Sequence, residues 1–306
     1  MIETFQQTLP HGITLSCRAC GQPGRPVLLF LHGFPEAAFV WDELLHHFAQ
    51  PENGGYRCVA PNLRGFEQSS APTEVPAYRA KPLVQDLTAL IDAITRDSLT
   101  PGQLAGLVAH DWGGALAWSV AAQYPAILRQ LAIVNAPHPA TFQRELANSP
   151  SQQASSAYMN FLARPDAPEL LAENDFARLW PFFTNMAADS GPMAWLDDAT
   201  RQRYREVWSL GLHGPCNYYA ASPLRPPTAN DPGAVAVQLA RERVTVNVPT
   251  LVVWGLGDTA LPEALLDGLD GFVPDLRIER VPGVTHWIVH EQPQQVAALI
   301  GDFLKA

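Results

Sequence analysis

The chain has 306 residues, of which 47% are hydrophobic and 16% charged, the proportions of a soluble globular protein with room for a well-filled core. Its formal net charge of −10 and its lack of any basic run argue against nucleic acid as a partner. No apolar run reaches the ~18 residues that cross a bilayer, and residues 1–12 lack the regions of a secretory signal. We therefore expect no membrane association and a cytoplasmic location.

Cysteine usage is sparse. Four cysteines are too few for a disulfide scaffold at this length. Cys17 and Cys20 have C-x-x-C spacing, but no second pair stands at the spacing of a zinc site. We interpret them as reduced, small apolar residues in a strand.

Strands and helices alternate over the first 137 residues. Short apolar runs that end in loops predict strands, and apolar positions three and four apart predict helices. Such alternation implies right-handed crossovers and a mostly parallel sheet. In chain order we expect strands at 12–18, 27–31, 57–61, 104–110 and 130–136, with helices at 38–49, 83–94 and 114–124 between them.

The pattern changes after residue 137. From 138 to 243 there are aromatic-rich helical segments and loops, including the Pro-rich stretch 221–233, but no buried-strand run. We expect one α/β core domain, residues 1–137 and 244–306, interrupted by a helical cap at 138–243. In its second part we expect strands at 250–255 and 276–281 and helices at 262–269 and 293–304.

The segment LVAHDWGGALAW (107–118) carries the strongest chemical signal. A buried strand ends at His110 and a helix follows from Gly113, so Asp111 occupies a sharp strand-to-helix bend with small residues around it. The adjacent helix N-terminus favours a negative charge there. A helix-capping Asp is the simpler alternative. No G-x-S-x-G occurs in the chain, so a serine cannot be the nucleophile of such a bend.

Three motifs together resemble the epoxide hydrolase and haloalkane dehalogenase branch of the α/β-hydrolase fold, the soluble epoxide hydrolases above all. They are HGFP (32–35), HDWGG (110–114) and GVTHW (283–287). The resemblance implies a mostly parallel sheet flanked by helices, a cap inserted after the sixth strand, and a tight turn at Phe34–Pro35 with a cis peptide. The chain departs from this family at Ala109, usually glycine, and at Glu67, usually a small residue. Nothing in the sequence explains Glu67.

An ester formed on Asp111 requires a general base for its hydrolysis. This fold places a histidine after the last strand, and we assign the base to His286 rather than to His290. Asp258, just past a strand end, completes the order nucleophile, acid, histidine. The other position for the acid holds Asn135, which cannot carry the charge. The backbone N–H groups of Phe34 and Trp112 are expected to form the oxyanion hole.

The leaving group separates the two chemistries of this branch. Opening an epoxide requires a proton donor, and a phenol suits that task. SAYMNFLARP (156–165) and GPCNYYA (214–220) resemble the two cap segments that carry ring-opening tyrosines, which places them at Tyr158 and Tyr219. Tyr218 and Tyr204 are the rival positions, and a packing role is the alternative for any of them. A side-chain N–H for a halide is missing at Phe34.

The expected function is therefore epoxide hydrolysis to a vicinal diol through an aspartyl alkyl ester, with an apolar epoxide and water as partners and no metal or organic cofactor. A haloalkane dehalogenase using the same Asp111 is one alternative. A non-catalytic hydrolase-fold binding protein is another, although such a protein would be expected to lack one of the three catalytic side chains. We expect a monomer or homodimer. Pocket size depends on cap side chains whose orientation the sequence leaves open, such as Trp180, Phe182, Phe183, Met186 and Trp195.

Overall fold

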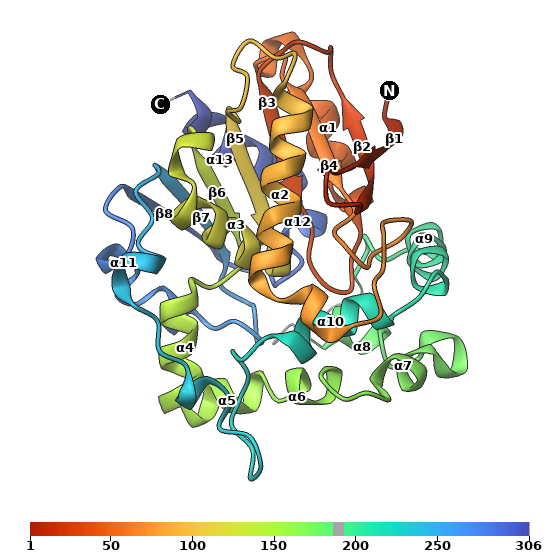
Figure 1. Ribbon diagram of the computed structural model, residues 1–306, viewed down its shortest axis with the longest axis vertical. Helices are drawn as coiled ribbons and strands as arrows, with labels where there is room; N and C mark the ends of the chain where they lie inside the picture. The colour runs from red at the N-terminus through yellow and green to blue at the C-terminus, as the bar shows by residue number, and fades with distance from the viewer. Residues whose placement is uncertain (186–192, 306) are drawn as a thin grey trace.

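The computed structural model describes residues 1–185 and 193–305, and its centre is one eight-stranded sheet (Figure 1). The strand order is β1-β2-β4-β3-β5-β6-β7-β8. β1 and β2 run antiparallel to their neighbours, and all other neighbouring strands are parallel. The strands are β1 (Glu3–Thr8), β2 (Thr14–Cys20), β3 (Val27–Leu31), β4 (Arg57–Pro61), β5 (Gly106–His110), β6 (Leu131–Val134), β7 (Thr250–Gly255) and β8 (Leu276–Val281).

Helices cover both faces of the sheet. In Figure 1, α2 and α3 lie in front of it and α1 and α13 behind it. Every residue of β3, β5, β6 and β7 is buried, as expected for parallel strands with both faces covered. The core helices are α1 (Asp42–Phe48), α2 (Ala80–Thr95), α3 (Asp111–Gln123), α12 (Ile288–Glu291) and α13 (Pro293–Leu304), and α11 (Arg241–Val244) lies where the cap sequence returns to the core.

The segment between β6 and β7 is helical and lies below the sheet in Figure 1, at the end where β5 leads into α3. This agrees with the expected cap after the sixth strand; the division at 138 and 243 into core and cap remains our proposal. Met186 lies outside the described residues. The cap helices are α4 (Pro139–Asn148), α5 (Pro150–Ser155), α6 (Tyr158–Leu162), α7 (Ala167–Phe176), α8 (Trp180–Thr184), α9 (Asp198–Ser209) and α10 (His213–Ala221).

Three sequence predictions differ from the structure. The sequence does not predict β1, because this edge strand is only partly buried and has a single apolar residue, Phe5, so it shows no apolar alternation. The segment 38–49 begins with a 3-10 turn before α1. Residues 262–269 form no α-helix; 3-10 turns occupy Glu263–Leu266 and Leu269–Gly271, and Gly268 between them has a positive φ of 71°.

The four cysteines are buried and unpaired, as expected. Burial raises the pKa of the Cys17 thiol to about 12, so the thiol stays protonated and unreactive. Within 1–185 and 193–305, no helix combines the length and the apolar character that spanning a bilayer demands.

Candidate active site

Asp111 is presented at a sharp bend between β5 and α3. It is the first residue of the helix and has a φ of 48°, a left-handed conformation that costs energy for a residue other than glycine. The bend brings backbones so close that side chains cannot fit beside it. A Cβ on Gly113 would lie 2.5 Å from the carbonyl oxygen of Leu31, and one on Gly33 would lie 2.2 Å from Oδ1 of Asp111. The small neighbours are therefore required by the geometry.

Asp258 and His286 complete a line of three side chains with Asp111. Nδ1 of His286 lies 2.7 Å from Oδ2 of Asp258, and Nε2 lies 3.7 Å from Oδ2 of Asp111. His286 and Asp258 are buried, and the side chain of Asp111 is 15% exposed. With its Nδ1 proton held by Asp258, the imidazole directs Nε2 towards Asp111, where a base for ester hydrolysis would be needed.

The charges of the site set the pKa of His286. Burial alone would lower it, but the charge and hydrogen bond of Asp258 outweigh burial, and Asp111 and Glu36 add to them. The net effect raises the pKa to about 9. An imidazolium therefore lies between two carboxylates at neutral pH.

The other oxygen of Asp111 faces a backbone amide. The N–H of Phe34 donates to Oδ1 over 2.7 Å, and the Phe34–Pro35 peptide is cis, as the resemblance implied. The N–H of Trp112 belongs to the first turn of α3, where a helix offers it no backbone partner. These are the two amides that the sequence proposed for the oxyanion hole.

Tyr158 and Tyr219 come from α6 and α10 of the cap. Their rings lie 6.2 Å apart, and Tyr219 also packs edge-on against Phe34 and Trp112 at 5.2 and 5.1 Å. Burial, with added repulsion from Asp111, keeps the pKa of each phenol well above the ordinary value. Both side chains are consequently protonated donors.

The rival tyrosines are engaged elsewhere. The hydroxyl of Tyr218 donates to the carbonyl of Arg64 over 2.9 Å, and that of Tyr204 lies 2.9 Å from Nε2 of His290. The structure thus gives both of these side chains structural partners outside the Asp111 site.

One cavity of about 900 Å³ connects the nucleophile with the cap. Asp111, Trp112, Tyr158 and Tyr219 all line it. The cap aromatics expected to set its size do not: Trp180, Phe183 and Trp195 pack among Tyr204, Trp208, Trp287 and His290 instead. Phe182 is close to the site, in edge contact with Phe34 and Tyr158. Aromatic cap residues were poor indicators because most of them form this separate core.

Residues 26–293 match the family model described as alpha/beta hydrolase fold. The chain belongs to the α/β-hydrolase family. It is 33% identical over 296 residues to epoxide hydrolase 3 of Xenopus tropicalis, covering 96% of this chain and 75% of that protein. A solved structure reported among novel epoxide hydrolases from metagenomes of hot environments has a TM-score of 0.85 at 34% identity, with 99% of each chain covered. An inhibitor complex of Bacillus megaterium epoxide hydrolase has the same TM-score at 26% identity, covering 99% of this chain and all of that one. This places the hydrolase in the epoxide hydrolase branch.

Asn135 of this hydrolase supports the acid rather than replacing it. Its Nδ2 donates to Oδ2 of Asp258 over 2.8 Å, and its Oδ1 accepts from the N–H of Gly255 over 2.9 Å. Oδ1 of Asp258 accepts from two further backbone amides, those of residues 260 and 261, at 2.9 Å each. The sequence presents Asn135 only at the rival position for the acid, and its place directly after β6 is the one signal of this contact.

A second buried charge lies behind His286 and was not predicted. Glu36 is fully buried, with Oε2 2.9 Å from Nδ1 of His110 and Oε1 3.0 Å from Nε2 of His290. Burial would raise the pKa of Glu36, but the two histidines hold it far below the ordinary range. Nε2 of His110 contacts the carbonyl oxygen of His286 at 2.9 Å. Both ring nitrogens of His110 thus face oxygen atoms.

His290, the rival base, belongs to this network. Its Nε2 faces Glu36 and Tyr204, and its ring stacks on Trp195 at 4.2 Å. Of the two histidines that follow β8, only His286 lies beside Asp111 in the described structure.

Glu67, unexplained by the sequence, has a structural role. Its carboxylate accepts from the Ser16 hydroxyl, from Nδ2 of Asn62 and from the N–H of Gln68. Asn62 in turn accepts from the N–H of Ala38 over 2.8 Å. Glu67 therefore joins the loop after β4 to β2 and to the turn that follows the Phe34 loop.

Aromatic donors are among the groups that attach the cap to the core. A hydrogen bond from a tryptophan or tyrosine side chain to a backbone carbonyl crosses the boundary at three places around the site. They are Trp208 to Pro35 at 2.7 Å, Trp287 to Phe182 at 3.2 Å and Tyr218 to Arg64 at 2.9 Å.

Proposed function

We propose that this hydrolase converts an apolar epoxide to a vicinal diol through a covalent ester on Asp111. The observation that carries the proposal is the position of the Asp111 carboxylate. It lies between the Phe34 amide and Nε2 of His286, and it lines the same cavity as the two cap tyrosines. A carboxylate so placed has an amide for one oxygen and free access to substrate for the other. The named activity of the relatives supports the same reaction.

The first step forms the ester. Oδ2 of Asp111 attacks the less hindered epoxide carbon, the C–O bond of the ring breaks, and a proton from Tyr158 or Tyr219 reaches the ring oxygen. The charge of Asp111 raises the pKa of both phenols, so its loss during attack makes their protons easier to give just as the oxygen needs one. Two donors also hold the oxygen while it gains charge.

The second step cleaves the ester. Because the ester removes the charge of Asp111, the His286 imidazolium first releases its proton to solvent. The neutral imidazole then removes a proton from water, the water oxygen bonds to the carboxyl carbon of Asp111, and negative charge gathers on Oδ1. The amides of Phe34 and Trp112 stabilise that charge. Collapse of the tetrahedral intermediate breaks the ester bond, and the leaving diol oxygen takes a proton from His286. The proton of the new carboxylic acid on Asp111 returns to the phenolate and restores the phenol. Asp258 fixes the imidazole throughout, and no cofactor enters these steps.

Isotopic oxygen tests the ester directly. With enzyme in excess and labelled water, a single turnover should place the label in the Asp111 carboxylate and leave the diol unlabelled, as mass spectrometry of the peptide and product would detect. Label in the diol alone would refute the covalent scheme. Halide release from a bromoalkane without diol from styrene oxide would select a dehalogenase instead. Binding without turnover of either would indicate a non-catalytic protein.

Two tyrosine variants test the proton donors. Tyr158→Phe and Tyr219→Phe should each lower the rate of ester formation about tenfold or more, because each removes a hydrogen bond worth about 1.5–3 kcal/mol to a developing charge. Tyr218→Phe is the matched control, since its hydroxyl binds a backbone carbonyl. Equal effects of all three changes would contradict the assignment.

A cytoplasmic location and a monomeric or dimeric state remain predictions.

A further inference from the structure

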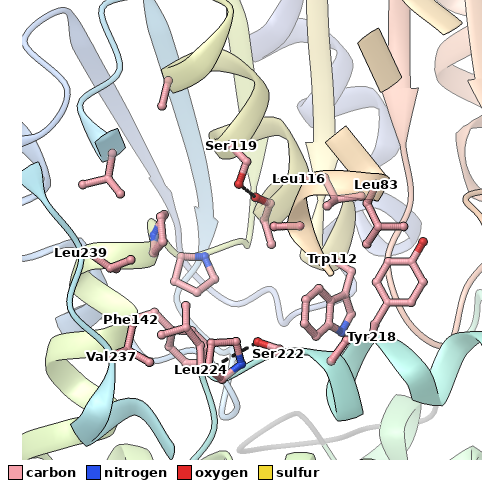
Figure 2. A pocket seen from close by; sticks show the side chains of 18 of the residues that line it. Leu83, Trp112, Leu116, Ser119, Phe142, Tyr218, Ser222, Leu224, Val237 and Leu239 are labelled. Atoms are coloured by element: carbon pink, nitrogen blue, oxygen red, sulfur yellow. Dashed lines mark hydrogen bonds between the residues drawn. The ribbon is translucent and has the colours of Figure 1, made fainter. Parts of the chain in front are cut away.

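The cavity extends well beyond the space that an epoxide ring needs. Its volume of about 900 Å³ is near the upper end of the ~300–1,000 Å³ typical of ligand pockets. Apart from the reacting groups, most of its lining is aliphatic or aromatic. Figure 2 shows Trp112 and Tyr218 on one side of this space and Leu239, Phe142 and Val237 on the other. The cavity therefore has a region remote from the nucleophile.

One face of α3 forms a wall of that remote region along nearly the whole helix. Positions three and four apart on a helix share a face, and the lining residues of α3 have this spacing. They are Trp112, Ala115, Leu116, Ser119, Ala122 and Gln123. From 112 to 123 the helix rises about 16 Å at ~1.5 Å per residue. The wall begins beside Asp111 and ends at the exposed Gln123 and Tyr124.

The two serine hydroxyls of the cavity lining are already occupied. The Ser119 hydroxyl donates to the carbonyl of Ala115 over 3.2 Å, and the Ser222 hydroxyl accepts from the N–H of Leu224 over 3.2 Å, bonds drawn in Figure 2. At the far end, Glu242 and Arg243 bring one charge of each sign. Neither the wall nor the opening therefore selects a charged or strongly polar group.

We propose that this α3 channel, lined by the face just described and by Phe142, Val237 and Leu239, binds the apolar tail of an elongated terminal epoxide. The inference rests on the proposed function, because it takes Asp111 as the point at which the ring reacts. An extended chain advances about 1.2 Å per bond, as three backbone bonds span ~3.3–3.6 Å. The channel thus accommodates roughly 13 bonds before the tail reaches solvent.

A series of straight-chain terminal epoxides from four to twelve carbons tests the channel. Burial of each methylene is worth about 0.8 kcal/mol, so kcat/KM should rise up to about fourfold per added carbon. A specificity independent of chain length would overturn the inference while the proposed function stands. Turnover of none of these epoxides would instead refute the proposed function.

Two substitutions then locate the tail. Ser119→Phe and Ala122→Phe would each fill the channel away from Asp111. Each should lower kcat/KM for decene oxide by about tenfold or more, because two or more methylenes would no longer be buried. The kcat/KM for butene oxide should stay within about twofold of its original value. Gln85→Phe, which adds the same ring on the exposed face of α2 and outside the cavity lining, should leave both values unchanged. Equal losses on both substrates by folded variants, checked by circular dichroism, would refute a tail site.

Discussion

The pH dependence of ester hydrolysis tests how the charges around His286 act. In the free enzyme burial lowers its pKa, but Asp258, Asp111 and Glu36 together raise it to about 9. Ester formation removes the charge of Asp111, whose Oδ2 lies 3.7 Å from Nε2. At an effective dielectric constant of about 20, that attraction is worth up to about 4 kcal/mol. Its loss makes the imidazolium up to roughly a thousandfold easier to deprotonate.

The neutral imidazole is the base, so the ester should decay faster as pH rises and then reach a plateau. The apparent pKa of that decay should lie well below about 9, because the raised value belongs to the free enzyme. Rapid quenching followed by intact-protein mass spectrometry, between about pH 5 and pH 10, measures the decay of the alkyl-enzyme. Nuclear magnetic resonance of the free enzyme's imidazoles provides the reference. An ester decay with the free-enzyme pKa would refute the reasoning.

Three further predictions concern the support of the site. Asn135→Leu removes the amide that binds Asp258, a hydrogen bond to charge worth about 1.5–3 kcal/mol, so ester hydrolysis should slow roughly 10- to 100-fold and the alkyl-enzyme should accumulate in burst experiments. Glu36→Gln removes a buried carboxylate that two histidine rings contact and should lower the free energy of unfolding by about 3–5 kcal/mol in urea titrations; an unchanged midpoint would argue against a stabilising role of Glu36. Gly114→Ala should cost about 1–3 kcal/mol, since its Cβ would lie 2.2 Å from another methyl carbon, whereas Gly301→Ala in α13 meets only ordinary contact at 3.6 Å and should stabilise by about 0.5–1 kcal/mol. If thermal unfolding shows that both substitutions change the stability in the same direction, the packing argument is contradicted.

The elements that the sequence predicted best are those in which a local pattern and a chemical requirement coincide. The bend at Asp111 needs a buried strand, a carboxylate and small neighbours within a few residues, and all of these are visible in HDWGG. Asp258 and His286 follow from their order after strand ends. The structure brings these three side chains together.

Features that depend on distant partners could not be predicted. Glu36 follows a turn motif and resembles any polar turn residue, because nothing local indicates that two histidines from later in the chain enclose it. Asn135 lacks the charge of an acid, and its bond to Asp258 joins residues 123 positions apart, so the sequence gives no local sign of that bond. The cavity lining could not be predicted either, since helix periodicity identifies the faces of α3 but not which face lines the cavity.

The aromatic hydrogen bonds between cap and core have a consequence for protein engineering. Each acceptor is a main-chain carbonyl, which every residue type supplies. Substitution of the residue that carries the acceptor therefore need not break the hydrogen bond between cap and core. At these three contacts the recognition information resides in the donor side chain. Chimeras that graft a foreign lid onto this scaffold should tolerate wide sequence divergence provided that Trp208, Tyr218 and Trp287, or equivalent donors, are retained.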